Sequence, residues 1–129
     1  MKLWLKRIGF EAFEEKYLSK NYDAENLYIW YIQQEEKVIA TMMLNKVDKE
    51  IGRIENVCCD IEYRGKGLAK RILDEILDFS REINLQKLQL GTYESLERAI
   101  GFYKKWGFVE KEEQRNPITN ARYYEMILN

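Results

Sequence analysis

A glycine-punctuated turn between a strand-like segment and an amphipathic helix constrains the fold of this chain more than any other feature. The turn has the sequence RGKGLA over residues 64–69. The preceding residues 54–60 are rich in strand formers, and apolar side chains recur from Leu68 to Ile83 at the spacing of one helical face. A strand that leads through such a turn into a helix leaves backbone N–H groups beside the positive end of the helix dipole. The turn is therefore a candidate phosphate-binding loop.

The composition of the loop adds to this interpretation without deciding it. Gly65 and Gly67 allow the backbone to approach an anion closely. Four cationic side chains lie in or just after the loop, namely Arg64, Lys66, Lys70 and Arg71. A glycine pair before a helix is also a common tight connection, so the loop alone leaves both interpretations open.

A second segment, AIGFYKKWGF over residues 99–108, predicts a helix that stops at a glycine and is followed by a strand. Together the two segments closely resemble the GNAT superfamily of acyl-CoA-dependent N-acetyltransferases. Arg64-x-x-Gly67-x-Ala69 matches the pyrophosphate-binding pattern of that family, and the tyrosine followed by Gly-Phe resembles its second signature. The resemblance covers Ile51 to Asn129 well and the first fifty residues poorly.

Length and charge favour one soluble domain. The chain has 129 residues, 46% of them hydrophobic, with 21 basic and 22 acidic residues and a formal net charge of −1. These values argue against disorder and against nucleic-acid binding, and no apolar run is long enough to span a membrane. We expect a single domain over residues 1–129, located in the cytoplasm.

The order of predicted elements indicates an α/β (α+β) fold. We expect strands at residues 1–8, 27–32, 38–44, 51–60, 85–91, 108–114 and 121–128, and helices at 10–18, 66–83 and 95–106. The helix between strands 51–60 and 85–91 makes that connection a crossover, which favours a parallel pair. The expected architecture is a GNAT-like mixed, mostly antiparallel sheet with a parallel splayed strand pair and flanking helices.

The resemblance also implies how a co-substrate is bound. It implies that acetyl-CoA is held at its pyrophosphate by the loop residues Arg64, Gly65, Lys66, Gly67, Leu68, Ala69 and Lys70. It further implies that the pantetheine arm pairs with the exposed strand edge of Val57, Cys58 and Cys59, and that a backbone N–H near Val57 polarises the thioester carbonyl. No metal is expected, because the chain has no histidine and no second cysteine pair.

Two side chains are candidates for the chemistry. Tyr103 matches the tyrosine of the family's second signature and is the candidate general acid, since a phenol stays protonated at neutral pH. Its place on an apolar helical stripe also suits a core residue. Glu55, on the strand that leads to the loop, is the candidate general base, and an ordinary solvent-facing strand residue is the alternative.

These observations lead to one functional hypothesis and one alternative. We expect an N-acetyltransferase that moves an acetyl group from acetyl-CoA to a primary amine by direct attack in a ternary complex. Cys58 and Cys59 are adjacent on one strand, so they are interpreted as small buried residues without a disulfide rather than as nucleophiles. A non-catalytic acyl-CoA-binding or sensing module of the same fold is the alternative. The expected partner is a small-molecule or peptide amine, with a homodimer left open and neither nucleic acid nor membrane expected.

Overall fold

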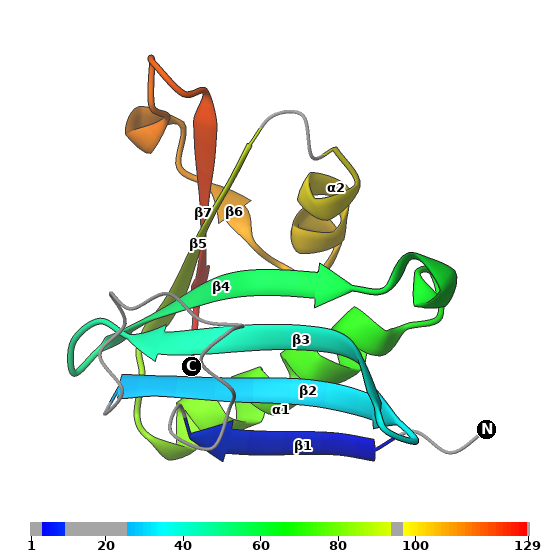
Figure 1. Cartoon of the computed structure of the whole chain (residues 1–129). Coiled ribbons are helices and arrows are strands. Elements are labelled where there is room, and N and C mark those ends of the chain that lie inside the picture. Colours follow the sequence, from blue (N-terminus) through cyan, green and yellow to red (C-terminus); the bar gives the residue numbers. More distant parts are fainter. Residues whose placement is uncertain (1–3, 10–25, 94–96, 129) are drawn as a thin grey trace.

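A computed structural model of the chain describes residues 4–9, 26–93 and 97–128 (Figure 1). Its strands are β1 Trp4–Gly9, β2 Leu27–Gln34, β3 Lys37–Lys46, β4 Ile51–Cys59, β5 Lys87–Tyr93, β6 Val109–Glu110 and β7 Ala121–Ile127. The helices are α1 Leu68–Glu82 and α2 Glu97–Lys105, with short 3-10 turns η4 Ile61–Tyr63 and η5 Glu112–Gln114. The described strands form one seven-stranded sheet in the order β1-β2-β3-β4-β5-β7-β6.

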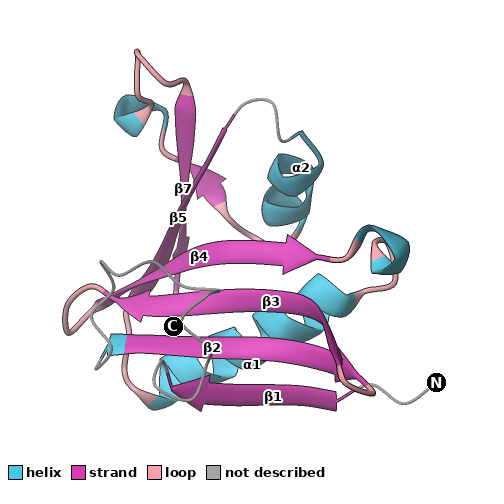
Figure 2. Ribbon diagram, in the orientation of Figure 1, coloured by secondary structure: helices cyan, strands magenta, loops and turns pink. Residues whose placement is uncertain are grey.

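The sheet has two antiparallel parts that meet at a single parallel pair. Strands β1 to β4 follow one another as antiparallel neighbours, and β5, β7 and β6 form the second antiparallel part. Strand β4 joins β5 in parallel, as the crossover through α1 requires. Figure 2 shows the second part rising away from the first beyond this junction. The expected mixed sheet with a splayed parallel pair is therefore confirmed.

Both helices lie on the same face of the sheet, which we call the first face. The crossovers β4-α1-β5 and β5-α2-β6 advance in the same direction along the strand order, and right-handed crossovers of this kind place their helices on one side. One buried cluster joins α1 and α2 to the sheet, and it includes Ile72, Ile76, Ile100, Leu88 and Tyr124. We call the opposite side the second face.

Several predicted boundaries differ from the structure, among them the strand expected at 85–91, which is observed as β5 Lys87–Tyr93. Two differences have clear local reasons. The first long helix begins at Leu68 rather than at Lys66, because Gly67 is its N-cap in the left-handed conformation, with φ of 79°. The predicted strand 108–114 is paired only at Val109–Glu110, since residues 112–114 turn into η5.

The N-terminal segment agrees with the sequence where it is described. The predicted edge strand is β1, which lies at one end of the sheet. The predicted helix at residues 10–18 and the proposed cap at Ser95 lie outside the described residues.

Candidate functional site

The glycine loop connects the end of β4 to the start of α1. Gly65 and Gly67 have φ values of 77° and 79°, in the region that favours glycine. The first α-helical bond runs from the Arg71 N–H to the Gly67 carbonyl at 3.1 Å. Within the described residues, no acceptor pairs with the backbone N–H groups of residues 65–70. A Cβ built on either glycine meets nothing within 4 Å, so these donors border open space.

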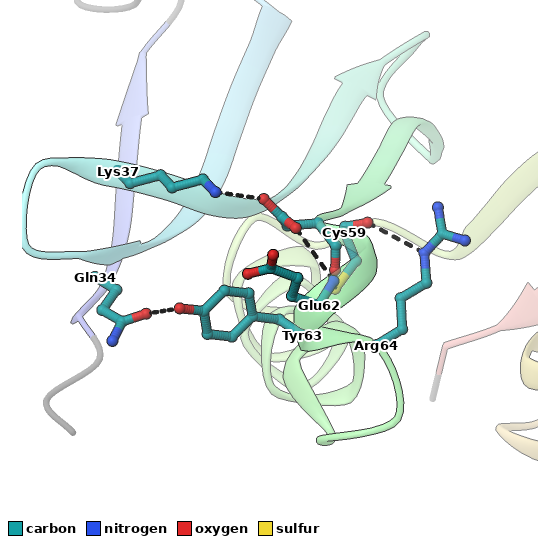
Figure 3. A network of polar contacts seen from close by, with 7 residues as sticks. Gln34, Lys37, Cys59, Glu62, Tyr63 and Arg64 are labelled. Carbon is teal, nitrogen blue, oxygen red and sulfur yellow. Dashed lines mark hydrogen bonds and ion pairs between the residues drawn. The ribbon is translucent and has the colours of Figure 1, made fainter.

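Side-chain contacts fix the start of this loop to the β2–β3 hairpin (Figure 3). The Asp60 carboxylate caps η4 by accepting from the Glu62 N–H, and it forms an ion pair with Lys37 at 2.8 Å. The hydrogen bond and charge of Lys37 lower the pKa of Asp60 below its usual value. The Tyr63 hydroxyl donates to Gln34 on the end of β2. The loop therefore leaves the sheet from a fixed position.

The cationic side chains of the loop have partners in the structure. Arg64 Nε donates to the Cys59 carbonyl at 3.2 Å, and the Lys66 ammonium lies 5.2 Å from the centre of the Tyr63 ring. Lys70 forms an ion pair with Asp74 and lies 4.3 Å from the centre of the Trp106 ring on the segment after α2. The start of α1 thus touches the end of α2. An anion at this loop would meet backbone donors first and these cations second.

Beside the loop, β4 and β5 part and leave a cavity between them. Their parallel pairing covers only Ile51–Lys87, Gly52–Leu88 and Arg53–Gln89. Beyond this point β4 has a bulge, where its register with β3 shifts between Cys58 and Glu55. A cavity of about 590 Å³, here called the wedge cavity, is lined by Arg53, Ile54, Glu55, Gln89, Leu90, Gly91, Gln114, Tyr123 and Tyr124.

The wedge cavity has walls from both faces of the sheet. Ile54, Leu90 and Tyr124 belong to the core cluster on the first face. Because successive strand side chains point to opposite faces, their neighbours Glu55 and Tyr123 lie toward the second face. The cavity therefore lies at the junction of the two parts of the sheet, bordered by side chains of the second face and by core residues of the first.

Glu55 occupies the β4 wall of this cavity. Its side chain is 18% exposed, and Oε1 lies 4.0 Å from the Arg53 guanidinium. Its other oxygen, Oε2, is enclosed by protein and has no hydrogen-bond partner. The structure thus places the candidate base in a cavity wall, unlike the solvent-facing residue that was the alternative.

Tyr103 lies on α2 and is 4% exposed, packed edge-to-face against Phe102 and Phe108. Burial raises the pKa of its phenol to about 12, so the hydroxyl keeps its proton through the neutral range. Both interpretations made from the sequence, core residue and proton donor, are compatible with this environment.

The two cysteines differ from each other. Both are free thiols, with Cys58 exposed and Cys59 half-buried. The expectation that both are buried is wrong for Cys58, whose side chain points to the face that does not pack against the core. Burial raises the pKa of the Cys59 thiol above its usual value. Val57, in the bulge, is exposed.

Sequence reasoning missed the far wall of the cavity. This wall includes Gln89 on β5, which the crossover brings beside β4. It also includes Tyr123 and Tyr124 on β7, which pairs with β5 and not with β4. The strand period alone assigns the adjacent Tyr123 and Tyr124 to opposite faces, but the mixed composition of β7 does not indicate which of them faces the core.

The described residues contain neither a metal-binding cluster nor a membrane-spanning helix. Within these ranges no group of three histidine, cysteine or acidic side chains is arranged to hold a metal ion. None of the described helices has the length and apolar character needed to cross a bilayer.

Comparisons with known proteins assign the chain to a family. Residues 1–108 match the model of the acetyltransferase (GNAT) family. A glucosamine 6-phosphate N-acetyltransferase of Trypanosoma brucei brucei is 36% identical over 66 residues, which cover 51% of this chain and 43% of the relative. N-acetyltransferase 8B of Homo sapiens is 30% identical over 97 residues, 70% of this chain and 43% of the relative. The chain thus spans less than half the length of these curated relatives.

The fold is also found among solved structures. A GNAT family acetyltransferase from Elizabethkingia anophelis, solved with acetyl-CoA bound, superposes with a TM-score of 0.79 at 17% identity. The superposition covers 98% of each chain.

Proposed function

Because the chain belongs to the acetyltransferase (GNAT) family, we propose that it transfers an acetyl group from acetyl-CoA to a primary amine. The observation that carries this proposal is the row of unpaired N–H groups at residues 65–70, placed beside the gap between β4 and β5. A diphosphate bound at the loop can then extend its acyl-bearing arm into the wedge cavity. The acetyl-CoA bound to the Elizabethkingia anophelis protein of similar fold supports the choice of co-substrate.

The loop residues fit a diphosphate chemically. Backbone N–H groups at a helix N-terminus bind phosphate oxygens through directed hydrogen bonds and the helix dipole. Here Gly65, Lys66, Gly67, Leu68, Ala69 and Lys70 would supply these donors, and the exposed Arg71 would add charge.

The free edge of β4 fits the arm of the co-substrate in part. The Asp60 N–H donates to Ile39 on β3, so the Cys59 carbonyl, one residue earlier, faces the opposite edge. Arg64 already occupies that carbonyl. The edge near Val57 in the bulge is then the place to bind the arm and to polarise the thioester carbonyl.

The acid and base follow from the same geometry. Glu55 is the group that takes the proton of the attacking amine, since it lines the wedge cavity and its carboxylate has only a 4.0 Å contact with Arg53. Tyr103 is the group that returns a proton to the departing thiolate, and its raised pKa of about 12 keeps it protonated for that task.

Direct attack of the amine in a ternary complex agrees with the state of the cysteines. A thiol serves as nucleophile only as the thiolate, and the raised pKa of Cys59 disfavours that form. Cys58 has no histidine to act as its base, because the chain contains none. The acetyl group therefore passes to the amine without an acetyl-cysteine.

The acceptor is proposed at the level of a chemical class. The Trypanosoma brucei brucei relative is named for glucosamine 6-phosphate, a small molecule with a primary amine. A small amine, free or at the end of a peptide, fits the wedge cavity of about 590 Å³.

Two measurements test the proposed function. Calorimetry should detect stoichiometric binding of acetyl-CoA, and a library of primary amines should include acceptors that release free CoA thiol. Absence of acetyl-CoA binding would contradict the proposal. Binding without thiol release for any amine would assign the chain to the non-catalytic sensing module.

A further inference from the structure

Glu55 and Tyr123 come from different parts of the sheet and line the same cavity. Glu55 lies on β4 in the first part, and Tyr123 lies on β7 in the second. Both side chains point to the second face, away from α1 and α2. An acceptor that enters from the second face would meet a carboxylate on one wall and an aromatic ring on the other.

The position of the Tyr123 ring depends on Gly91. The two residues are direct partners across β5 and β7. A Cβ built on Gly91 would lie 3.0 Å and 3.2 Å from two carbons of the Tyr123 ring, tighter than most Cβ contacts, so the ring would have to shift by a few tenths of an ångström. The absent side chain of Gly91 thus lets the ring lie against strand β5 at the wall of the cavity.

The protein leaves the Glu55 carboxylate without a close hydrogen-bond partner at Oε2. Its Oε1 lies 4.0 Å from the Arg53 guanidinium, while Oε2 has no partner and is enclosed. An unpaired carboxylate oxygen held away from water is unfavourable unless a donor reaches it in another state of the protein. A bound ammonium group is a donor of the right charge.

We propose that Glu55 and the ring of Tyr123 form the acceptor subsite and bind the acceptor as a primary ammonium ion. The carboxylate accepts an N–H bond from the ammonium, and the ring attracts its positive charge through the π face. Both contacts favour a cationic amine over a neutral group of equal size. The inference rests on the proposed function, because it assigns a residue to the acceptor half of that reaction.

Binding of a simple amine tests this subsite without knowledge of the natural acceptor. The n-propylammonium ion is titrated into the ¹⁵N-labelled chain, and amide shifts are followed at Gln89 and Gly91, with 1-propanol as the neutral probe of equal size. We expect saturable shifts with propylammonium and none with 1-propanol.

Variants separate the ring from its hydroxyl and from its support. Tyr123→Leu should weaken propylammonium binding about three- to fivefold, the size of an exposed cation–π contact, whereas Tyr123→Phe should stay within about twofold. Gly91→Ala should weaken binding in the same direction but by less than Tyr123→Leu, because it shifts the ring by only a few tenths of an ångström. Gly101→Ala is the matched control, since a Cβ there meets nothing within 4 Å.

The outcomes distinguish this inference from the proposed function. Parental affinity in both Tyr123→Leu and Gly91→Ala would overturn the inference, as would equal binding of 1-propanol or no binding of propylammonium to the parent chain. Weaker propylammonium binding in both variants, with no binding of 1-propanol to the parent chain, supports the inference. A melting curve of each variant shows that the fold is retained. Acetyl-CoA calorimetry on the same samples reports separately on the proposed function.

Discussion

The glycine loop and the wedge cavity are built in different ways. The loop is formed by contiguous residues, 60–71, and it presents backbone N–H groups. The wedge cavity takes its walls from three separate strands and from Gln114 in η5, and it presents side chains. Backbone donors are the same whatever side chains surround them, so the loop suits a group common to many reactions. The side chains of the cavity can change with the acceptor while the loop stays the same.

The strongest test of this contrast is a substitution that blocks the backbone of the loop. Gly67→Val places a β-branched side chain at a φ of 79°, over the N–H groups that face open space. Losing one or two charge-assisted hydrogen bonds of about 1.5 to 3 kcal/mol each should weaken acetyl-CoA binding by about a hundredfold. Calorimetry measures this loss.

A matched variant controls for backbone strain. Asn84→Val also places valine at a positive φ, 63°, but just after α1 and away from the loop. It should cost similar stability and leave the affinity for acetyl-CoA unchanged. Undiminished affinity in a folded Gly67→Val variant would mean that the loop is only a tight connection.

The second test asks whether the reaction uses a specific side chain of α2, the buried phenol of Tyr103. Tyr103→Phe keeps the ring and its packing and removes only the hydroxyl, so kcat should fall about ten- to a hundredfold with little change in the affinity for acetyl-CoA. Steady-state kinetics measure both. A parental rate would show that Tyr103 is a packing residue.

The same variant has a signature in alkaline stability. The folded-state pKa of Tyr103 is raised from 10.0 to about 12, so its neutral form is favoured in the folded chain. The stability associated with this group is present below pH 10 and is lost as the pH rises from 10 to about 12. Tyr103→Phe should lack this loss, which unfolding in denaturant at several pH values would detect.

A third test perturbs the second part of the sheet, which carries Tyr123, without touching the glycine loop. Glu110 on β6 accepts hydrogen bonds from Arg122 and Arg115, which lower its pKa from 4.5 to about 2. The stability that the ionised Glu110 contributes to the folded chain is present above pH 4.5 and is lost as the pH falls toward 2. Glu110→Gln should cost about 1 to 2 kcal/mol at neutral pH and flatten that acid dependence.

The affinity for acetyl-CoA decides what the third test means. If the glycine loop and the second part of the sheet are independent, Glu110→Gln leaves the affinity for acetyl-CoA, measured by calorimetry, at the parental value. A parallel loss of acetyl-CoA affinity would contradict the separation of the two regions.

The smallest effect is expected at the cysteines. Cys58→Ala combined with Cys59→Ala removes both thiols, and direct transfer predicts a rate within about twofold of the parent after a small packing loss at Cys59. Mass spectrometry of the parent chain during turnover provides the opposing result. An acetyl-cysteine that passes its group to the amine would replace direct transfer.

The sequence was informative wherever the chemistry is local. Gly65 and Gly67 indicate a left-handed backbone conformation by their residue type, and the periodicity after Leu68 predicts α1. The loop could therefore be located to within two residues. The crossover also predicts the parallel pair. These features depend on neighbours in the chain, which a single sequence displays.

The sequence was uninformative where the chemistry depends on register. Nothing local in Gly91 or Tyr123 indicates that one makes room for the other, because that contact follows from the pairing of β5 with β7. The partner of Arg64 is likewise set by the path of the loop back to the Cys59 carbonyl. Residues 112–114 also leave the sheet early, although Phe108 to Gln114 read as one strand.

Gly52 lies at the vertex from which the two parts of the sheet diverge. A Cβ there would lie 2.7 Å from a Leu44 methyl, 2.9 Å from a Leu85 methyl and 3.0 Å from a Leu88 methyl, so the three leucines pack into the space that the missing side chain leaves. A larger residue at position 52 would therefore change the packing at the point where the two parts diverge, although Gly52 does not line the wedge cavity.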